Sequence, residues 1–201
     1  MFLAEQMKSD LKEKEITMNQ NHSFEDTVNN DSMEGIVTVL GRGFDENGNY
    51  LDGEVLHKHN LILNGAREIM RNVMVGEPGI YKVVFGDLGK DESSTTSELI
   101  NVPSPSESDT ALVRKVGEKV ITVDNITKIG KGTDINPDGR PGIRYEIILE
   151  KSELVPENSD QQFILEMGLS TESEMLFSRI THPVIIKTRS LQITLIWEIL
   201  F

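Results

Sequence analysis

The sequence predicts a mainly β protein, an antiparallel β-sandwich or small barrel with one amphipathic helix and an extended N-terminal arm. Three observations support this fold class. Short runs of β-branched and apolar residues alternate with clusters of Gly, Pro, Asn and Asp, which is typical of antiparallel strands and their turns. One segment, residues 64–76, has the apolar period of an amphipathic helix. The first 34 residues follow neither pattern.

Residues 1–34 differ in composition from the rest of the chain. They are polar and Asn-rich, with eight acidic residues and three lysines. Such a composition is typical of a segment that stays disordered or that orders on a neighbouring subunit. A short apolar helix face for docking could be formed by Phe2, Leu3, Met7 and Leu11. We therefore divide the chain into an arm, residues 1–34, and one β-rich domain, residues 35–201.

The domain is expected to begin with a long hairpin over residues 35–63. The strand "GIVTVLGRGF" leads into the cluster "DENGNYLDGE", where Asn47-Gly48 and Asp52-Gly53 are both turn dipeptides. The strand "EVLHKHNLIL" follows. Its period of two places four side chains on one side, namely Val55, His57, His59 and Leu61.

The predicted helix lies in "NGAREIMRNVMVGEP". Asn64 is a suitable N-cap residue, Gly76 suits the left-handed position after the helix, and Pro78 prevents continuation. The apolar face, which recurs at helical spacing, consists of Ala66, Ile69, Met70, Val73 and Met74.

The remaining segments are predicted to be strands separated by turns and one long loop. The strand "IYKVVFGDLG" precedes residues 90–110, a polar Ser/Thr/Pro loop that is longer than most connections. Further strands are expected in "ALVRKVGEKVITVDNITKIGKG", "IRYEIILEKSEL", "QQFILEMGLS" and "SEMLFSRITHPVIIK".

The final segment, "SLQITLIWEILF", is the most strand-like in the chain. Alternation predicts one buried face made of Leu191, Ile193, Leu195, Trp197, Ile199 and Phe201. The opposite face also carries Ile196 and Leu200. We expect that face to be covered either by the helix over residues 65–75 or by a neighbouring subunit.

Composition excludes several functional classes. The net charge of -13 argues against binding to nucleic acid or to an anionic membrane surface, which both require clustered Lys and Arg. The chain has no Cys, which excludes disulfides and thiolate metal sites. The start of the chain lacks the apolar stretch of a signal peptide, and no run reaches the roughly 20 apolar residues of a membrane-spanning helix.

Two segments resemble metal-binding patterns, and neither predicts a metal site. Asp45, Asn47 and Asn49 have the 1, 3, 5 spacing of a calcium loop, but Tyr50 and Leu56 stand where that loop needs Gly and Glu. A hairpin turn explains the same residues. On the second strand, His57 and His59 share a face, but the chain's two other histidines, His22 and His182, are distant in sequence.

The sequence predicts neither an enzyme nor a cofactor site. There is no Cys nucleophile, no Gly-x-Ser-x-Gly segment and no Ser beside an identifiable base. Acid pairs are uninformative in a chain with 33 Asp and Glu. We therefore expect a protein that acts by binding neighbours, with no catalytic residues and no metal.

The order of several short motifs resembles that of bacteriophage tail-fibre and baseplate-type virion proteins. The motifs are "HNLILNGAREIMRNVM", "YKVVFGDLG", "PSPSESDTALVRKV", "LEMGLS", "MLFSRITHPVIIK" and the closing "LQITLIWEILF". Each motif is short, and their order and spacing over residues 35–201 carry the resemblance. The glycine turn here is Gly86-Asp87-Leu88-Gly89 rather than the usual Gly-x-Gly with Thr.

The resemblance implies a structural component of a phage virion at the tail, baseplate or neck, of fibre or collar type. Its partners would be other virion proteins and further copies of the same chain, and it would be made in the cytoplasm of the bacterial host. One alternative is a capsid decoration or head-fibre protein. Another is a module that binds host-surface carbohydrate, which usually requires exposed aromatic side chains.

Overall fold

The computed structural model describes residues 33–91, 93–130 and 140–201. Within these ranges nine strands form one antiparallel sheet, curled into a half-barrel, in the order β4-β3-β7-β8-β2-β1-β9-β6-β5. The strands are β1 Glu34–Phe44, β2 Tyr50–Ile62, β3 Lys82–Gly86, β4 Lys115–Val120, β5 Ile126–Ile129, β6 Gly142–Leu149, β7 Gln161–Ser170, β8 Leu176–Thr188 and β9 Gln192–Leu200. The helices are α2 Gly65–Met74, α3 Thr96–Ile100 and the short 3-10 helix η2 Val123–Asn125. The predicted fold class, mainly β with few helices, is confirmed. The predicted arm residues Phe2, Leu3, Met7 and Leu11 lie outside the described residues.

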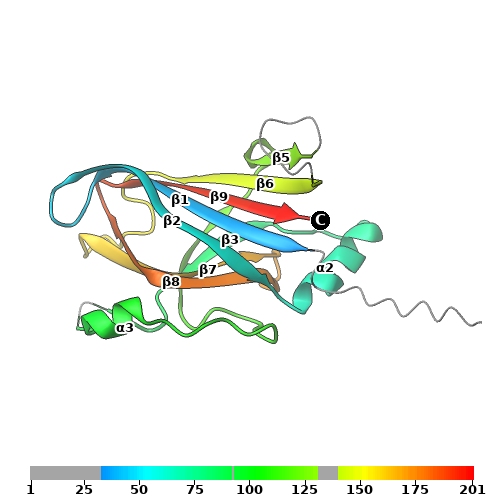
Figure 1. Ribbon diagram of the computed structural model, residues 1–201, viewed down its shortest axis with the longest axis horizontal. Coiled ribbons are helices and arrows are strands. Elements are labelled where there is room, and N and C mark those ends of the chain that lie inside the picture. Colours follow the sequence, from blue (N-terminus) through cyan, green and yellow to red (C-terminus); the bar gives the residue numbers. More distant parts are fainter. Residues whose placement is uncertain (1–32, 92, 131–139) are drawn as a thin grey trace, which may run out of the picture. The chain divides into compact units, whose positions relative to one another are not determined.

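The sheet folds over at the junction between β2 and β8. These strands pair only at one end, where Leu61 lies opposite Arg179 and Ile62 opposite Ser178. The strands β5, β6, β9, β1 and β2 form one layer, and β4, β3, β7 and β8 form the other (Figure 1). The helix α2 lies at one end of the two layers, near the end of β9, and α3 lies below β7 and β8 (Figure 1).

Strand register aligns the core side chains in rows across β1, β9 and β6. The two central rows are Val37–Trp197–Tyr145 and Val39–Leu195–Ile147. Each of these side chains is at most 5% exposed. Burial of one large apolar side chain contributes about 1.5–3 kcal/mol, so these rows provide much of the stability of the five-stranded layer.

The terminal strand is central in that layer, with β1 on one side and β6 on the other. Five of its predicted core residues are at most 3% exposed, namely Leu191, Ile193, Leu195, Trp197 and Ile199. Phe201 differs, because it is 42% exposed and follows the end of the strand. Its N–H donates to the carbonyl oxygen of Pro141 at 2.9 Å, one residue beyond the last pair of β6 and β9. The prediction that Phe201 belongs to the core is therefore wrong.

The helix α2 does not cover the outer face of β9, which was one of the two arrangements that the sequence predicted. Ala66 and Ile69 of that helix pack into the core between the layers. Leu200 is only 7% exposed because it packs at the edge formed by β5 and β6. A Cβ atom on Gly142 would lie 3.0 Å from Leu200 Cδ2 and 3.1 Å from Ile129 Cγ1, so the missing side chain makes room for both.

The helix α2 buries only part of its predicted apolar face. Ala66 and Ile69 are at most 2% exposed and Met70 is partly buried, but Val73 is 50% and Met74 81% exposed. The last turn therefore lies outside the core. Asn64 makes no side-chain capping bond; its backbone N–H donates instead to the carbonyl of Glu107 at 2.9 Å. Asn64 is thus tied to the loop and does not act as the predicted side-chain cap.

The hairpin of β1 and β2 turns at one of its two predicted turn dipeptides. Asn47-Gly48 lies in the turn, whereas Asp52-Gly53 lies within β2. Gly53 has φ 152°, which favours glycine, and the register shifts nearby: Val39 pairs with Leu56 but Leu40 with Glu54. The second dipeptide therefore belongs to an irregular part of the strand rather than to a turn.

Candidate functional site

Three of the short motifs noted in the sequence meet on the outer face of the four-stranded layer. Glu166 of β7 is fully buried, and its Oε2 accepts two hydrogen bonds from Arg179 of β8, at 3.1 and 2.5 Å. Arg179 also forms an ion pair with Asp109 in the loop that precedes β4. These residues come from "LEMGLS", "MLFSR" and "SESDTAL". We call the three residues the clasp.

The clasp holds the loop over the sheet. Glu166 Oε1 accepts the backbone N–H groups of Val113 and Arg114, at 2.9 and 3.2 Å. A Cβ atom on Gly86 would lie 2.5 Å from the same oxygen, so glycine at that position makes room for the carboxylate. Both carboxylate oxygens of Glu166 thus have partners within the protein. The arrangement suits attachment of the loop rather than acid–base chemistry.

Two further contacts fix the loop on either side of the clasp. Arg114 donates to both carboxylate oxygens of Asp87, at 2.7 and 2.6 Å, in a bidentate pair that joins the loop to the turn after β3. Thr181 of β8 donates to the carbonyl of Pro103 at 2.7 Å. The segment expected as a polar loop over residues 90–110 also contains α3, whose N-terminus has a capping box between Thr95 and Glu98. It is therefore more ordered than its composition indicated.

An apolar hollow of about 360 Å³ opens at the end of the half-barrel, between α2 and the ends of β6 and β9. Its lining includes Ile69, Ile80, Ile143, Tyr145 and Ile199, all apolar or aromatic. Its lining also includes the exposed side chains of Val73, Met74 and Phe201. We call the hollow with its lining residues the α2 end. Contiguous exposed apolar surface of this kind marks contact sites on soluble proteins.

A second hollow, of about 460 Å³, is polar and lies beside the turn after β3. Asp87, Lys90, Asp91 and Arg114 line one side of it. Arg114 is paired with Asp87 and Lys90 with Glu98, so these four charges compensate one another in pairs. Asp91 keeps its negative charge and accepts a hydrogen bond from the backbone N–H of Ser93.

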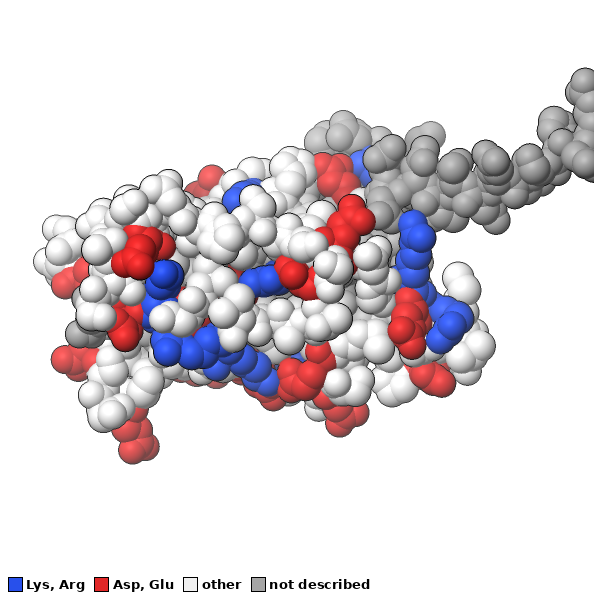
Figure 2. All heavy atoms as spheres, turned by 90° about the horizontal axis from the view of Figure 1, so that it is seen from below, with Lys and Arg blue, Asp and Glu red and all other residues white. Residues whose placement is uncertain are grey.

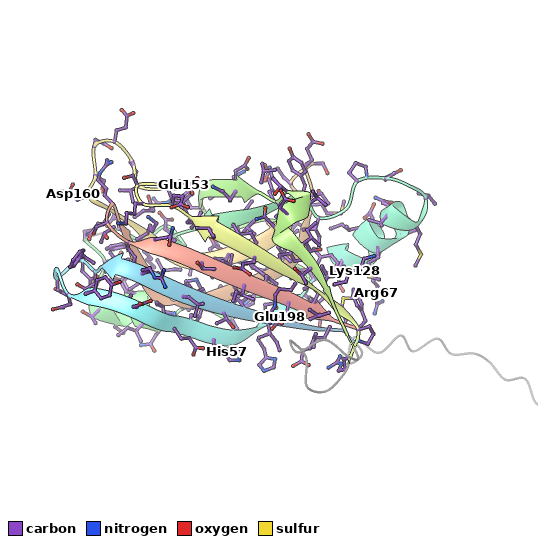
Figure 3. All side chains as sticks on the ribbon, turned by 90° about the horizontal axis from the view of Figure 1, so that it is seen from above. His57, Arg67, Lys128, Glu153, Asp160 and Glu198 are labelled. Carbon is purple, nitrogen blue, oxygen red and sulfur yellow. The ribbon has the colours of Figure 1, made fainter. Side chains whose placement is uncertain are left out.

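The histidines considered as metal ligands do not form a cluster. His57 and His59 of β2 are on the outer face, where His57 Nδ1 lies 2.8 Å from Thr38 Oγ1 and His59 Nδ1 lies 2.8 Å from Glu34 Oε1. Figure 3 labels His57 on β2 and Glu198 on β9. His182 is fully buried in β8. In the described ranges no three His, Cys, Asp or Glu side chains are grouped to hold a metal ion.

The calcium-like residues at the hairpin tip form a turn. Asp45 Oδ1 accepts the N–H groups of Asn47 and Asn49, at 2.9 and 2.8 Å. The hydrogen bond from Asn49 is the largest cause that lowers the pKa of Asp45. The carboxylate is thus used within the turn, as the hairpin interpretation predicted.

Two buried ionisable residues were not identified from the sequence. Lys187 is fully buried, and its Nζ donates to the carbonyl of Thr188 at 3.1 Å; burial lowers its pKa to about 8. His182 is also fully buried, and burial lowers its pKa to about 4. Both stand in apolar stretches, "VIIK" and "ITHPV". Their apolar neighbours in the sequence were the only available sign that these two residues are buried. Those neighbours do not show that both faces of β8 are covered.

Surface charge is mixed rather than segregated. Seen from below, Lys and Arg side chains are interspersed with Asp and Glu (Figure 2). One ion-paired group joins Lys82 and Lys115 to Glu118 and Glu174, with N–O distances of 2.5 to 2.9 Å.

No protein-family model, curated protein or solved structure matches this chain. No helix in the described part is long and apolar enough to cross a membrane.

Proposed function

We propose that the chain is a structural component of a bacteriophage virion, at the tail, baseplate or neck, that acts through contacts with neighbouring virion proteins. The observation that carries the proposal is the convergence of its motif residues. Asp109 lies 70 residues before Arg179 in the sequence, yet it meets the Glu166–Arg179 pair in the clasp. This supports a shared structural role for motifs whose order resembles that of tail-fibre and baseplate-type proteins.

The α2 end supplies a contact surface that fits this role. A rigid β-scaffold with an apolar hollow at one end can bind a neighbour without any chemical step. Residues 1–34 supply a second means of contact in the proposal, because a polar arm that orders on assembly can wrap a large surface.

The test is to look for the chain in purified particles. Particles from the phage that encodes this chain are purified on a density gradient, and the chain is quantified by mass spectrometry and located by cryo-EM. We expect a fixed copy number at the tail, baseplate or neck. A position on the capsid would favour the decoration or head-fibre alternative, and absence from particles would overturn the proposal.

The arm is tested separately with a variant that lacks residues 1–30. We expect it to keep the melting temperature of the full chain but to be absent from particles. Incorporation at wild-type occupancy would show that the arm is not needed.

One observation favours the carbohydrate-binding alternative. Phe44 and Tyr50 at the hairpin tip are 49% and 63% exposed, and their rings form an edge-to-face pair with centroids 5.6 Å apart. Exposed aromatic rings can stack on sugars, although a cross-strand pair also stabilises a hairpin. Binding on a glycan array that is lost in Tyr50→Ala and retained in Val123→Ala would support this alternative.

A further inference from the structure

The hollow at the α2 end reaches inward as far as Tyr145, a core residue of β6. Its mouth lies between α2 and the ends of β6 and β9 (Figure 1). Val73 in its lining is 50% exposed, whereas Tyr145 and Ile199 are 5% and 1% exposed. The hollow therefore runs from the surface to side chains of the core. Its volume of about 360 Å³ lies within the range of about 300–1,000 Å³ that is usual for small-molecule sites.

Tyr145 brings an unused polar group to this apolar space. Within the described ranges its hydroxyl has no hydrogen-bond partner, and burial is the only cause that shifts its pKa. Burial raises the pKa of Tyr145 to about 12, so the hydroxyl stays protonated and is able both to donate and to accept. Native proteins leave few buried polar groups without a partner. A hydroxyl of this kind in the lining of an open hollow indicates a partner that enters from outside.

Two more polar side chains without partners stand on the same inner face of the sheet. Trp197 lies opposite Tyr145, and its buried indole N–H has no acceptor among the described residues. In the next row Gly35 lies opposite both Asn60 and Ile199. A Cβ atom on Gly35 would lie 2.0 Å from Asn60 Oδ1, so the amide lies across the glycine on the side of Ile199. Neither atom of that amide has a partner in the described ranges. Hydrogen-bonding capacity is therefore unused around the inner end of the hollow, and Tyr145 is the residue that lines it.

We propose that the α2 end binds a neutral, mainly apolar small molecule whose one hydrogen-bonding group, such as a hydroxyl or a carbonyl, meets the hydroxyl of Tyr145. The apolar part of the ligand would pack against side chains such as Ile80 and Ile143. The ligand is neutral because no described side chain in the lining carries a charge, and an uncompensated ion is costly to bury. This inference goes beyond the proposed virion role, which requires no ligand.

Three probes of similar shape test the ligand class. 2-Naphthol is neutral and carries a hydroxyl, 2-methylnaphthalene lacks a hydrogen-bonding group, and 2-naphthoate carries a negative charge. Each is titrated into the purified full chain at pH 7 and followed by protein NMR. We expect 2-naphthol to bind most tightly, 2-methylnaphthalene about three- to tenfold more weakly, and 2-naphthoate most weakly. The indole N–H signal of Trp197, the single Trp of the chain, should shift with 2-naphthol because Trp197 neighbours Tyr145.

Two variants test the site itself. Tyr145→Phe should reduce the affinity for 2-naphthol to that for 2-methylnaphthalene and leave the latter unchanged. It should not lower the melting temperature, because the hydroxyl has no partner within the protein to lose. Val73→Trp places a large ring at the mouth of the hollow and should weaken the binding of both probes. Its matched control is Val123→Trp, because Val123 is 81% exposed and lies in η2, outside the lining. Thermal unfolding shows that each variant is folded.

Three results would contradict the proposal. They are no binding of 2-naphthol by the wild type, equal binding of 2-naphthol by Tyr145→Phe or Val73→Trp, and binding of 2-naphthoate as tight as that of 2-naphthol. The first result would leave the hollow as part of a protein contact surface. Because binding is measured on purified protein, its failure is distinguishable from absence of the chain in particles.

Discussion

Arg179 and Glu166 form an ion pair on the face of the sheet that the loop before β4 covers. The guanidinium donates to Glu166 Oε2 at 3.1 and 2.5 Å, and the two side chains are 7% and 0% exposed. The pair comes from adjacent strands, Arg179 lying on β8 and Glu166 on β7. Because the remaining oxygen of Glu166 accepts two backbone N–H groups of the loop, the pair links sheet and loop into one unit.

Removal of one partner of this pair should be costly. In Arg179→Met, Glu166 keeps its buried negative charge but loses its cation, and we expect the free energy of unfolding to fall by about 3–5 kcal/mol. The double variant Glu166→Gln/Arg179→Met removes both charges and should lose less than Arg179→Met alone. Urea unfolding followed by circular dichroism measures Arg179→Met, Glu166→Gln and the double variant. A double variant as unstable as the sum of the two single variants would show that the pair has no coupling.

The sequence predicted the parts of this region but not their meeting. The motifs around Asp109, Glu166 and Arg179 were visible, and alternation identified the strands that contain two of them. Their contact depends on which strands are neighbours and on the path of a long loop, and neither property has a local signal. The same limit explains why Phe201 and Met74 are exposed although both were predicted to lie on buried faces. The apolar periods of a strand and of a helix continue to the end of the segment, whereas the core ends where the packing partners end. Local patterns therefore predicted the strands, the helix and the core faces well, and the clasp and the α2 end less well.

The buried amine of Lys187 should make stability depend on pH above neutrality. Its pKa is about 8 in the folded chain, against about 10.4 in an unfolded one. Between these values the unfolded chain binds more protons, so the free energy of unfolding rises with pH, and the cost of burying the amine is fully present below pH 8. Lys187→Met should be more stable than the wild type at pH 7, by a margin that shrinks towards pH 9.5.

Urea unfolding at pH 7, 8, 9 and 9.5 measures this margin. Lys128→Met is the control, because Lys128 is exposed on β5 and its removal should not alter the slope. A constant difference between Lys187→Met and the wild type over this range would contradict the prediction.

His182 should make the free energy of unfolding depend on pH in the acidic range. Burial holds its pKa near 4 in the folded chain, below the ordinary value of 6.5. From pH 6.5 downward the unfolded chain takes up a proton that the folded chain does not, so stability falls as the pH falls towards 4. His182→Gln should flatten this slope between pH 6.5 and 5, where most carboxylates are still ionised. His57→Gln, at an exposed strand position, should leave it unchanged, and equal slopes in all three proteins would exclude the role of His182.

The end of the chain provides a test of where the core stops. Trp197 is fully buried in the row between Val37 and Tyr145, and Trp197→Ala should lower the free energy of unfolding by about 3–5 kcal/mol. Deletion of residues 197–201 removes Ile199 and Leu200 as well, and it also removes the strand that β1 and β6 share at this end. Against a typical total of about 5–15 kcal/mol, that deletion should unfold the domain. Deletion of Phe201 alone should change the melting temperature little, because this residue lies past the last pair of the sheet. If Trp197→Ala and the single-residue deletion had equal effects in thermal unfolding, the boundary of the core at Leu200 would be wrong.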